Sequence, residues 1–151
     1  MKFYIATRLE QAARHRQLAH ALTGGGHVLT YDWTVHGNVR KDGEVRLRET
    51  AIAETRGVVE ADVLIGLLPG GRGTHVEIGM ALGLGKPVLL WSEKEHGLFE
   101  ADDRTCAFYH HPLVHRIGLA WGLCFLGIFD TMSRLPVEAR RRLMKEGMDG
   151  P

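Results

Sequence analysis

The chain has 151 residues, 44% of them hydrophobic and 25% charged, a composition typical of a single soluble domain that folds around its own core. The formal net charge of +1 lacks the large basic excess of proteins that bind nucleic acid polymers, so we expect no such partner. The cysteines, Cys106 and Cys124, do not show the spacing of a disulfide framework in a small secreted protein.

The first half of the chain alternates between strand and helix patterns. Residues 2–6 predict a strand, and residues 9–23 predict a helix that ends at the three glycines of 24–26. Residues 27–31 predict a second strand, the polar segment 32–43 a loop, and residues 45–60 a second helix. The stripes expected to face the core are Leu9, Ala12, Ala13, Ala19 and Leu22 in the first helix, and Leu47, Ala51, Thr55 and Val58 in the second.

The second half of the chain continues this alternation. Residues 62–68 form a near-continuous apolar run, which is typical of a strand buried on both faces. A glycine-rich turn at 69–73 leads into a helix predicted over 74–85, and a fourth strand follows at 88–91. Residues 92–104 predict a charged loop, residues 105–109 a fifth strand, and residues 113–129 and 136–145 two C-terminal helices.

The alternation of strands and helices indicates an α/β fold. We predict a flavodoxin-like (Rossmann-like) three-layer fold with a five-stranded parallel sheet in the order 2-1-3-4-5, plus C-terminal helices. We expect one domain over residues 1–151, with a core at about 1–112 and a helical tail at 113–151.

Two features of the sequence bear on where the protein resides. The longest apolar run, Ile117–Phe129, has 13 residues, fewer than the ~20 that cross a bilayer. Residues 1–5 lack the basic and apolar regions of a signal peptide. We therefore expect a cytoplasmic protein with no membrane partner.

The predicted topology places a ligand site at one edge of the sheet. In such sheets, ligands bind beyond the carboxyl ends of the strands, at the point where the strand order reverses. Here that point lies between the first and third strands, so residues 6–8 and 69–77 meet there. The loop that contains Asp32 and Trp33 opens at the same edge.

The glycine-rich turn after the third strand is the most unusual segment at this edge. Gly70, Gly71 and Gly73 let the backbone approach a ligand closely, and the N-terminus of the next helix favours an anionic or hydroxylated ligand. The turn matches neither a P-loop nor the dinucleotide-binding fingerprint. A tight connection between strand and helix explains the glycines equally well.

Two glutamates supply candidate carboxylates for chemistry at this edge. Glu77 either caps the helix in a capping box with Thr74, or stays ionised beside the helix N-terminus and attacks an anomeric carbon. Glu54 shares the apolar face of the second predicted helix, where burial raises a carboxyl pKa and suits a general acid. The alternative for Glu54 is a position at the edge of that stripe with its carboxylate in water.

Three stretches of this region resemble a known family. The sequences ADVLIG at 61–66, GTHVEIGMA at 73–81 and GKPV at 85–88 are similar to the nucleoside 2-deoxyribosyltransferase family, which includes nucleotide N-hydrolases. The resemblance covers roughly residues 2–91. It implies a flavodoxin-like fold and cleavage of the N-glycosidic bond of a nucleoside or nucleoside 5′-monophosphate, with the sugar passed to water or to a second base.

The resemblance also implies roles for individual residues. Glu77 matches the family's nucleophile, Tyr4 a tyrosine that assists it, and Arg8 a basic residue near the sugar and phosphate. Glu54 matches a second acid that is more often aspartate in the family. The family is oligomeric and completes its sites with a neighbouring chain, so the resemblance implies at least a homodimer.

One position departs from the family pattern. The transferases usually carry an aspartate six residues before the glutamate, where this chain has Gly71 beside Arg72. With Arg8 and Arg72 both near the crevice, a 5′-phosphate becomes a plausible feature of the substrate, although both arginines also fit ordinary solvated surface. We expect the substrate to be bound by Thr7, Arg8, Trp33, Gly71, Arg72, Gly73 and Thr74.

Other features of the sequence leave alternatives open. Trp33 either stacks on the base or belongs partly to the core. The cluster of His110, His111 and His115 does not predict a metal site, and the reaction needs no metal or redox cofactor. A catalytically silent nucleotide-binding module, or an N-glycosidase acting on a nicotinamide dinucleotide, are the alternative functions.

Overall fold

The computed structural model describes residues 1–92, 99–103, 105–117, 127, 129, 130 and 134. Its sheet has five parallel strands: β1 (Lys2–Ala6), β2 (Val28–Leu29), β3 (Val63–Leu68), β4 (Val88–Ser92) and β5 (Val114–Ile117). The strand order is β2-β1-β3-β4-β5, so the predicted flavodoxin-like topology is confirmed. The order reverses between β1 and β3, whose registers pair Phe3 with Val63 and Ala6 with Gly66.

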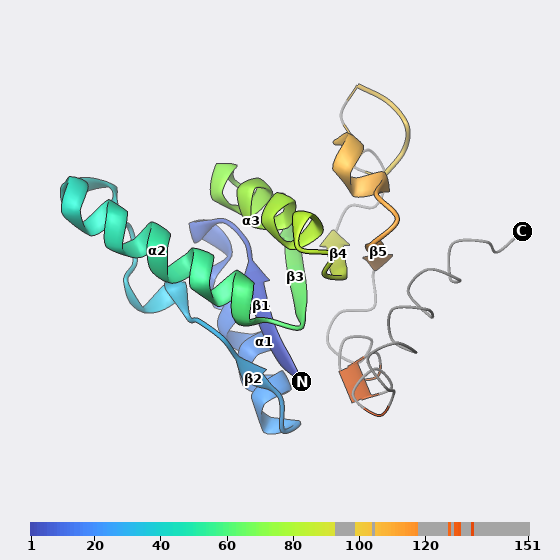
Figure 1. Ribbon diagram of the computed structural model, residues 1–151, viewed down its shortest axis with the longest axis horizontal. Coiled ribbons are helices and arrows are strands. Elements are labelled where there is room, and N and C mark those ends of the chain that lie inside the picture. Colours follow the sequence, from blue (N-terminus) through green and yellow to red (C-terminus); the bar gives the residue numbers. More distant parts are fainter. Residues whose placement is uncertain (93–98, 104, 118–126, 128, 131–133, 135–151) are drawn as a thin grey trace, which may run out of the picture.

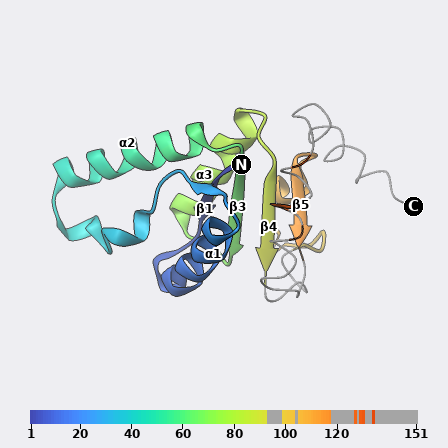
Figure 2. The ribbon, with the colours of Figure 1, turned by 90° about the horizontal axis from the view of Figure 1, so that it is seen from below.

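Helices cover both faces of the sheet. The main helices are α1 (Ala12–Gly24), α2 (Glu44–Glu60) and α3 (Arg72–Gly83). Short 3₁₀ turns lie at η1 (Leu9–Gln11), η2 (Trp33–Val35), η3 (Val39–Lys41) and η4 (Ala107–His110). Figures 1 and 2 show α1 on one face and α2 with α3 on the other, which gives three layers.

Successive side chains of each strand divide between these two faces, as strand geometry requires. Phe3 and Ile5 join the core cluster beneath α1, whereas Tyr4 and Ala6 join the cluster beneath α2 and α3. The same alternation separates Leu89 and Trp91 from Val88 and Leu90. Tyr4 is therefore buried in the layer that also receives side chains from α2 and α3.

The predicted inner stripes of the helices are partly wrong. In α1, Leu9 is 41% exposed and precedes the helix, whereas His15 and Leu18 join Ala19 and Leu22 in the buried face. In α2, the residues that face the core are Thr50, Gly57 and Val58, whereas Leu47, Ala51 and Thr55 are exposed. For Leu47 and Ala51 the reason is geometric, because the N-terminal half of α2 extends past the edge of the sheet (Figure 2).

The predicted fifth strand is also wrong in position. Residues 107–110 form the 3₁₀ turn η4, and the strand that pairs with β4 lies at Val114–Ile117, inside the segment predicted as a helix. Its burial pattern explains the error, because only the two end residues of this edge strand are buried and the middle residues are His115 and Arg116. The sheet thus extends beyond residue 112, where the tail was expected to begin.

Much of the predicted helical tail lies outside the described residues. Phe129 is buried and meets the ring of Phe3 edge-on, at a centroid distance of 5.8 Å, and the ring of His27 at 5.2 Å. This part of the tail therefore belongs to the core beneath α1. The predicted helix at 136–145 is not described. Among the described residues, no helix has the length and hydropathy to cross a membrane.

Candidate active site

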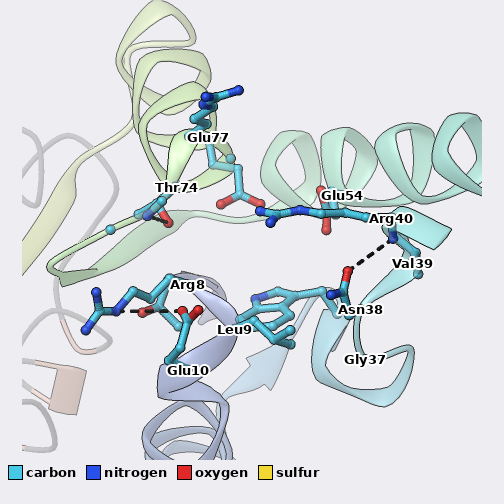
Figure 3. A pocket seen from close by; sticks show the side chains of 16 residues that line it. Arg8, Leu9, Glu10, Gly37, Asn38, Val39, Arg40, Glu54, Thr74 and Glu77 are labelled. Atoms are coloured by element: carbon cyan, nitrogen blue, oxygen red, sulfur yellow. Dashed lines mark hydrogen bonds and ion pairs between the residues drawn. The ribbon is translucent and has the colours of Figure 1, made fainter.

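A pocket of about 440 Å³ lies at the carboxyl ends of β1 and β3, where the strand order reverses. Three parts of the chain build it: the segment after β1, the N-terminal turn of α3, and the face of α2 with the turns that precede it (Figure 3). Its lining comprises Thr7, Arg8, Leu9, Glu10, Trp33, Gly37, Asn38, Val39, Arg40, Glu54, Gly70, Gly71, Arg72, Gly73, Thr74 and Glu77.

Glu77 and Tyr4 form a buried hydrogen-bonded pair at this pocket. The Tyr4 hydroxyl donates to Glu77 Oε1 at 2.5 Å, and the two residues are 0% and 6% exposed. Tyr4 comes from β1 and Glu77 from α3, so the bond links two segments 73 residues apart. Tyr4 lies behind Glu77 and does not line the pocket itself.

The helix that carries Glu77 begins earlier than the sequence predicts. α3 starts at Arg72 with Gly71 as its N-cap residue, and Thr74 Oγ1 accepts a hydrogen bond from the Gly71 N–H at 3.1 Å. Glu77 therefore lies in the second turn of α3, and its carboxyl accepts a hydrogen bond from Tyr4. The predicted capping box between Thr74 and Glu77 is therefore wrong. Gly70 is required here, because a Cβ at this residue would lie 2.6 Å from Thr74 Cγ2.

Glu54 reaches the same pocket from α2. Its side chain is half-buried, and Gly57, one turn later, allows α2 to pack directly on the ring of Tyr4. A Cβ at Gly57 would lie 2.9 Å from Tyr4 Cε2 and 2.7 Å from Tyr31 Cβ. The close approach of α2 to β1 thus brings the second carboxyl to the face where Glu77 lies.

The proton affinities of these groups are strongly perturbed. The pKa of Glu77 is raised to about 8, chiefly by burial; the hydrogen bond from Tyr4 lowers it in part, and the nearby charge of Glu54 adds to the rise. Burial also raises the pKa of Glu54. Burial and the carboxylate of Glu77 raise the pKa of Tyr4, which stays a neutral donor. Near neutral pH the two carboxyls therefore retain a proton between them.

Basic and hydroxyl groups lie on the β1 and α3 side of the pocket. Arg8 follows β1 and forms an ion pair with Glu10 at 3.8 Å, with 43% of the Arg8 side chain exposed. Arg72 is the first residue of α3, and both arginines line the cavity. The Thr7 hydroxyl donates to Leu67 O at 3.0 Å, so it ties β1 to β3 beneath the pocket.

Trp33 forms part of both the core and the pocket wall. It is 8% exposed, and its indole Nε1–H donates to Ile5 O at 3.0 Å. On the α1 side, its ring meets that of His15 at a centroid distance of 5.1 Å. The indole is therefore fixed in place, with one part of its surface open to the cavity.

The segment after Trp33 contains lining residues that the sequence analysis missed. It was expected to be only a loop, but Gly37, Asn38, Val39 and Arg40 all line the pocket. Asn38 Oδ1 accepts from the Arg40 N–H at 3.1 Å and so caps η3. An asparagine directly before such a turn is a usable sequence signal, because its side chain often accepts a hydrogen bond from the backbone two residues on. Leu9 and Glu10 were missed as well.

His75 stabilises the α3 turn from outside the pocket. Its Nδ1 lies 2.8 Å from Gly71 O, and its Nε2 lies 2.7 Å from the hydroxyl of buried Tyr109. The carbonyl can only accept, so Nδ1 carries the proton and Nε2 accepts from Tyr109. The contact holds the Gly71 carbonyl in place at the start of the helix. Among the described residues, no group of three or more His, Cys, Asp or Glu side chains forms a metal-binding cluster.

Comparison with known proteins places this geometry in context. The model of a family described as nucleoside 2-deoxyribosyltransferase matches residues 3–127. The structure is similar to that of the CMP N-glycosidase BcmB of Clostridium botulinum, with 21% sequence identity and a TM-score of 0.59, over 87% of this chain and 98% of that chain. This likeness concerns the fold. No curated protein matches the chain.

Proposed function

This chain belongs to the nucleoside 2-deoxyribosyltransferase family, and we propose that it cleaves the N-glycosidic bond of a nucleoside 5′-monophosphate through a glycosyl-enzyme on Glu77. Cleavage or transfer at an N-glycosidic bond is the chemistry of the family. The nucleophile, the phosphate and the roles of the other residues are the parts that we infer.

The observation that carries the proposal is the buried hydrogen bond between Tyr4 and Glu77. Burial of a carboxyl that is 6% exposed, with a pKa raised to about 8, costs folding stability. Such a group is more common at functional sites than elsewhere in a protein. The hydroxyl of Tyr4 fixes one oxygen of this carboxyl at 2.5 Å, and the residue lines the cavity. A fixed carboxylate at a pocket wall suits attack on an anomeric carbon.

The proposed reaction has two steps. In the first, Glu77 attacks C1′, the electron pair of the breaking C1′–N bond moves onto the base, and protonated Glu54 gives its proton to the departing base. In the second, water attacks C1′, the pair of the C1′–O bond returns to Glu77, and Glu54 takes the proton from water. A second base in place of water would give transfer instead.

The phosphate is assigned to the side of the pocket formed by β1 and α3. The first turn of α3 presents backbone N–H groups that have no partner within the helix, together with the positive end of the helix dipole, and Gly70, Gly71 and Gly73 leave it open. Arg72 and Arg8 line the same side and supply positive charge, although Arg8 also pairs with Glu10. Arginine pairs with phosphate through two parallel hydrogen bonds.

The test is release of free base from a panel of nucleosides and 5′-nucleotides by the wild type, Glu77→Gln and Glu60→Gln. Glu60→Gln is the control, since Glu60 is an exposed carboxylate on α2 outside the pocket. We expect release from 5′-nucleotides by the wild type and the control, and a loss of at least about 10³-fold in Glu77→Gln.

Two further measurements accompany this assay. Mass spectrometry after acid quench should detect the wild-type chain with one added sugar phosphate, and addition of a free second base should show whether the sugar is transferred. Nucleotide binding by the wild type without any release of base would contradict the proposal and indicate a binding module.

A further inference from the structure

The pocket has two ends with different chemistry. Figure 3 shows Arg8 and Thr74 on one side, Asn38, Val39 and Arg40 on the other, and Glu77 between them. In a nucleotide, the base leaves C1′ and the phosphate is attached through C4′, at opposite ends of the sugar. If the phosphate lies toward Arg8, the base lies toward Glu54 and the η3 turn.

Arg40 is the charged residue that η3 contributes to this second end. Its backbone N–H is held by the Asn38 side chain at 3.1 Å, and its side chain extends toward Glu77 (Figure 3). Among the described residues, its guanidinium has no ion pair or side-chain hydrogen bond, unlike Arg46, which bonds His36 and Glu49. The Arg40 guanidinium is thus available to a ligand.

The donors at this end select the edge of the base that they meet. A guanidinium carries five N–H donors and no acceptor, and it does not lose its proton. Asn38 uses its Oδ1 on the Arg40 backbone, which leaves its amide N–H groups as donors. This end therefore suits a carbonyl oxygen, which only accepts hydrogen bonds, and its positive charge repels a base that must be protonated before it leaves.

We propose that Arg40 binds the carbonyl beside the glycosidic nitrogen of the leaving base, so that the preferred substrate is a pyrimidine 5′-nucleotide. As Glu77 bonds to C1′, the pair of the C1′–N1 bond moves onto N1 and is shared with O2, and the fixed positive charge of Arg40 stabilises it there. Glu54 then delivers the proton to the base. This inference rests on the proposed function.

The first test measures recognition without turnover. In the Glu77→Gln background, the dissociation constants of CMP, UMP and AMP are measured by calorimetry with and without Arg40→Ala. We expect Arg40→Ala to raise the dissociation constants of CMP and UMP by about 10- to 100-fold and that of AMP by less than about 3-fold. Equal weakening of all three nucleotides would place Arg40 on the phosphate and overturn the proposal.

The second test measures catalysis with leaving groups of different acidity. In the Glu77-intact chain, we expect Arg40→Ala to lower kcat for UMP by about 10²-fold and for 5-fluoro-UMP by much less, because the fluorinated base carries its charge more easily. Methylguanidine added to Arg40→Ala should restore part of kcat. An equal loss for both substrates would mean that Arg40 does not stabilise the leaving group.

A matched control lies next to Arg40 in the same turn. Lys41 belongs to η3 but does not line the pocket, so Lys41→Ala should leave both affinity and kcat unchanged. The two tests also separate this inference from the proposed function. If the wild type releases base but Arg40→Ala affects pyrimidine and purine nucleotides alike, only this inference is overturned. Pyrimidine-selective binding through Arg40 without turnover in the wild type overturns the proposed function and supports the base assignment.

Discussion

At the scale of single residues, the Tyr4–Glu77 pair explains how a buried carboxyl can act as a nucleophile. Burial favours the protonated form of Glu77, whereas attack on C1′ needs the carboxylate. The hydroxyl of Tyr4 stabilises the carboxylate through a hydrogen bond of 2.5 Å to Oε1, so we expect Oε2 to be the oxygen that attacks the substrate. Glu54 shares the remaining proton, so one carboxyl is poised to attack and the other to donate.

The pH dependence of activity follows from this arrangement. Because the reaction needs one proton on the Glu77–Glu54 pair, we expect kcat/KM to fall as the pH rises through about 8, where the pair loses that proton. Tyr4→Phe removes the one hydrogen bond that lowers this pKa, so the midpoint should move to higher pH and kcat should fall.

The measurement is a pH profile of kcat/KM for the wild type and Tyr4→Phe, with Tyr31→Phe as a control. Tyr31 is a half-buried neighbour of Tyr4 that does not bond Glu77. A falling limb that stays in place in Tyr4→Phe would show that the hydroxyl does not tune the pKa of Glu77.

At the scale of secondary-structure elements, the site depends on how closely α2 packs on β1. Gly57 is the contact point, because its missing side chain is replaced by the ring of Tyr4 and Cβ of Tyr31. A glycine inside a helix costs stability, so its presence in α2 needs such a reason. Through this contact, the same residue sets the position of Glu54 and of the Tyr4 ring.

Gly57→Ala tests this packing. We expect it to destabilise the fold by about 1–3 kcal/mol, because the new methyl group would lie within 3 Å of two side chains. Displacement of Tyr4 should also lower kcat/KM by about 10-fold or more. Chemical denaturation and steady-state kinetics measure the two effects.

A matched substitution lies on α3. Gly79 is an exposed helical glycine with nothing within 4 Å of its added Cβ, so Gly79→Ala should stabilise the chain by about 0.5–1 kcal/mol. If Gly57→Ala were as stable as Gly79→Ala, the close contact of α2 with Tyr4 would not matter for folding.

At the scale of the whole molecule, one buried histidine connects the α1 layer to the pocket wall. His15 is 0% exposed and packs against Trp33. Its Nδ1 lies 3.8 Å from Asp32 Oδ1. Burial lowers the pKa of His15 to about 4, although the charge of Asp32 opposes this shift. The folded protein therefore keeps His15 neutral at pH values where the unfolded chain is protonated.

The sign of the resulting pH dependence is fixed. Between the ordinary histidine pKa near 6.5 and about 4, the unfolded chain binds a proton that the folded chain does not, so stability falls as the pH falls. The contribution of His15 is on the order of 3 kcal/mol. We expect His15→Gln to lose less stability than the wild type over this interval.

Urea denaturation at a series of pH values from 7 to 4 measures this effect. His20→Gln is the control, because His20 is an exposed residue of the same helix, and this variant should follow the wild-type curve. A His15→Gln curve parallel to that of the wild type would show that other groups cause the acid instability.

Much of the fold was predictable because it rests on local patterns. The apolar runs of β1, β3 and β4, separated by helical periodicity, indicated parallel strands and their order. The edge strand was misplaced, since β5 is buried only at Val114 and Ile117 and so lacks a continuous apolar signal. The inner face of α2 was misjudged because the exposed apolar residues Leu47 and Ala51 mark a face that the sheet does not cover.

The sequence by itself determined the topology and the edge of the sheet where a site forms, because strand and helix periodicity and the switch in strand order do not depend on details of packing. It also drew attention to Glu77, although both a cap and a nucleophile matched its spacing. Only the tertiary structure decided between a helix-capping contact and a buried bond to Tyr4, and only it brought Arg40 to the pocket. These contacts join distant segments, and local sequence patterns carry no information about them.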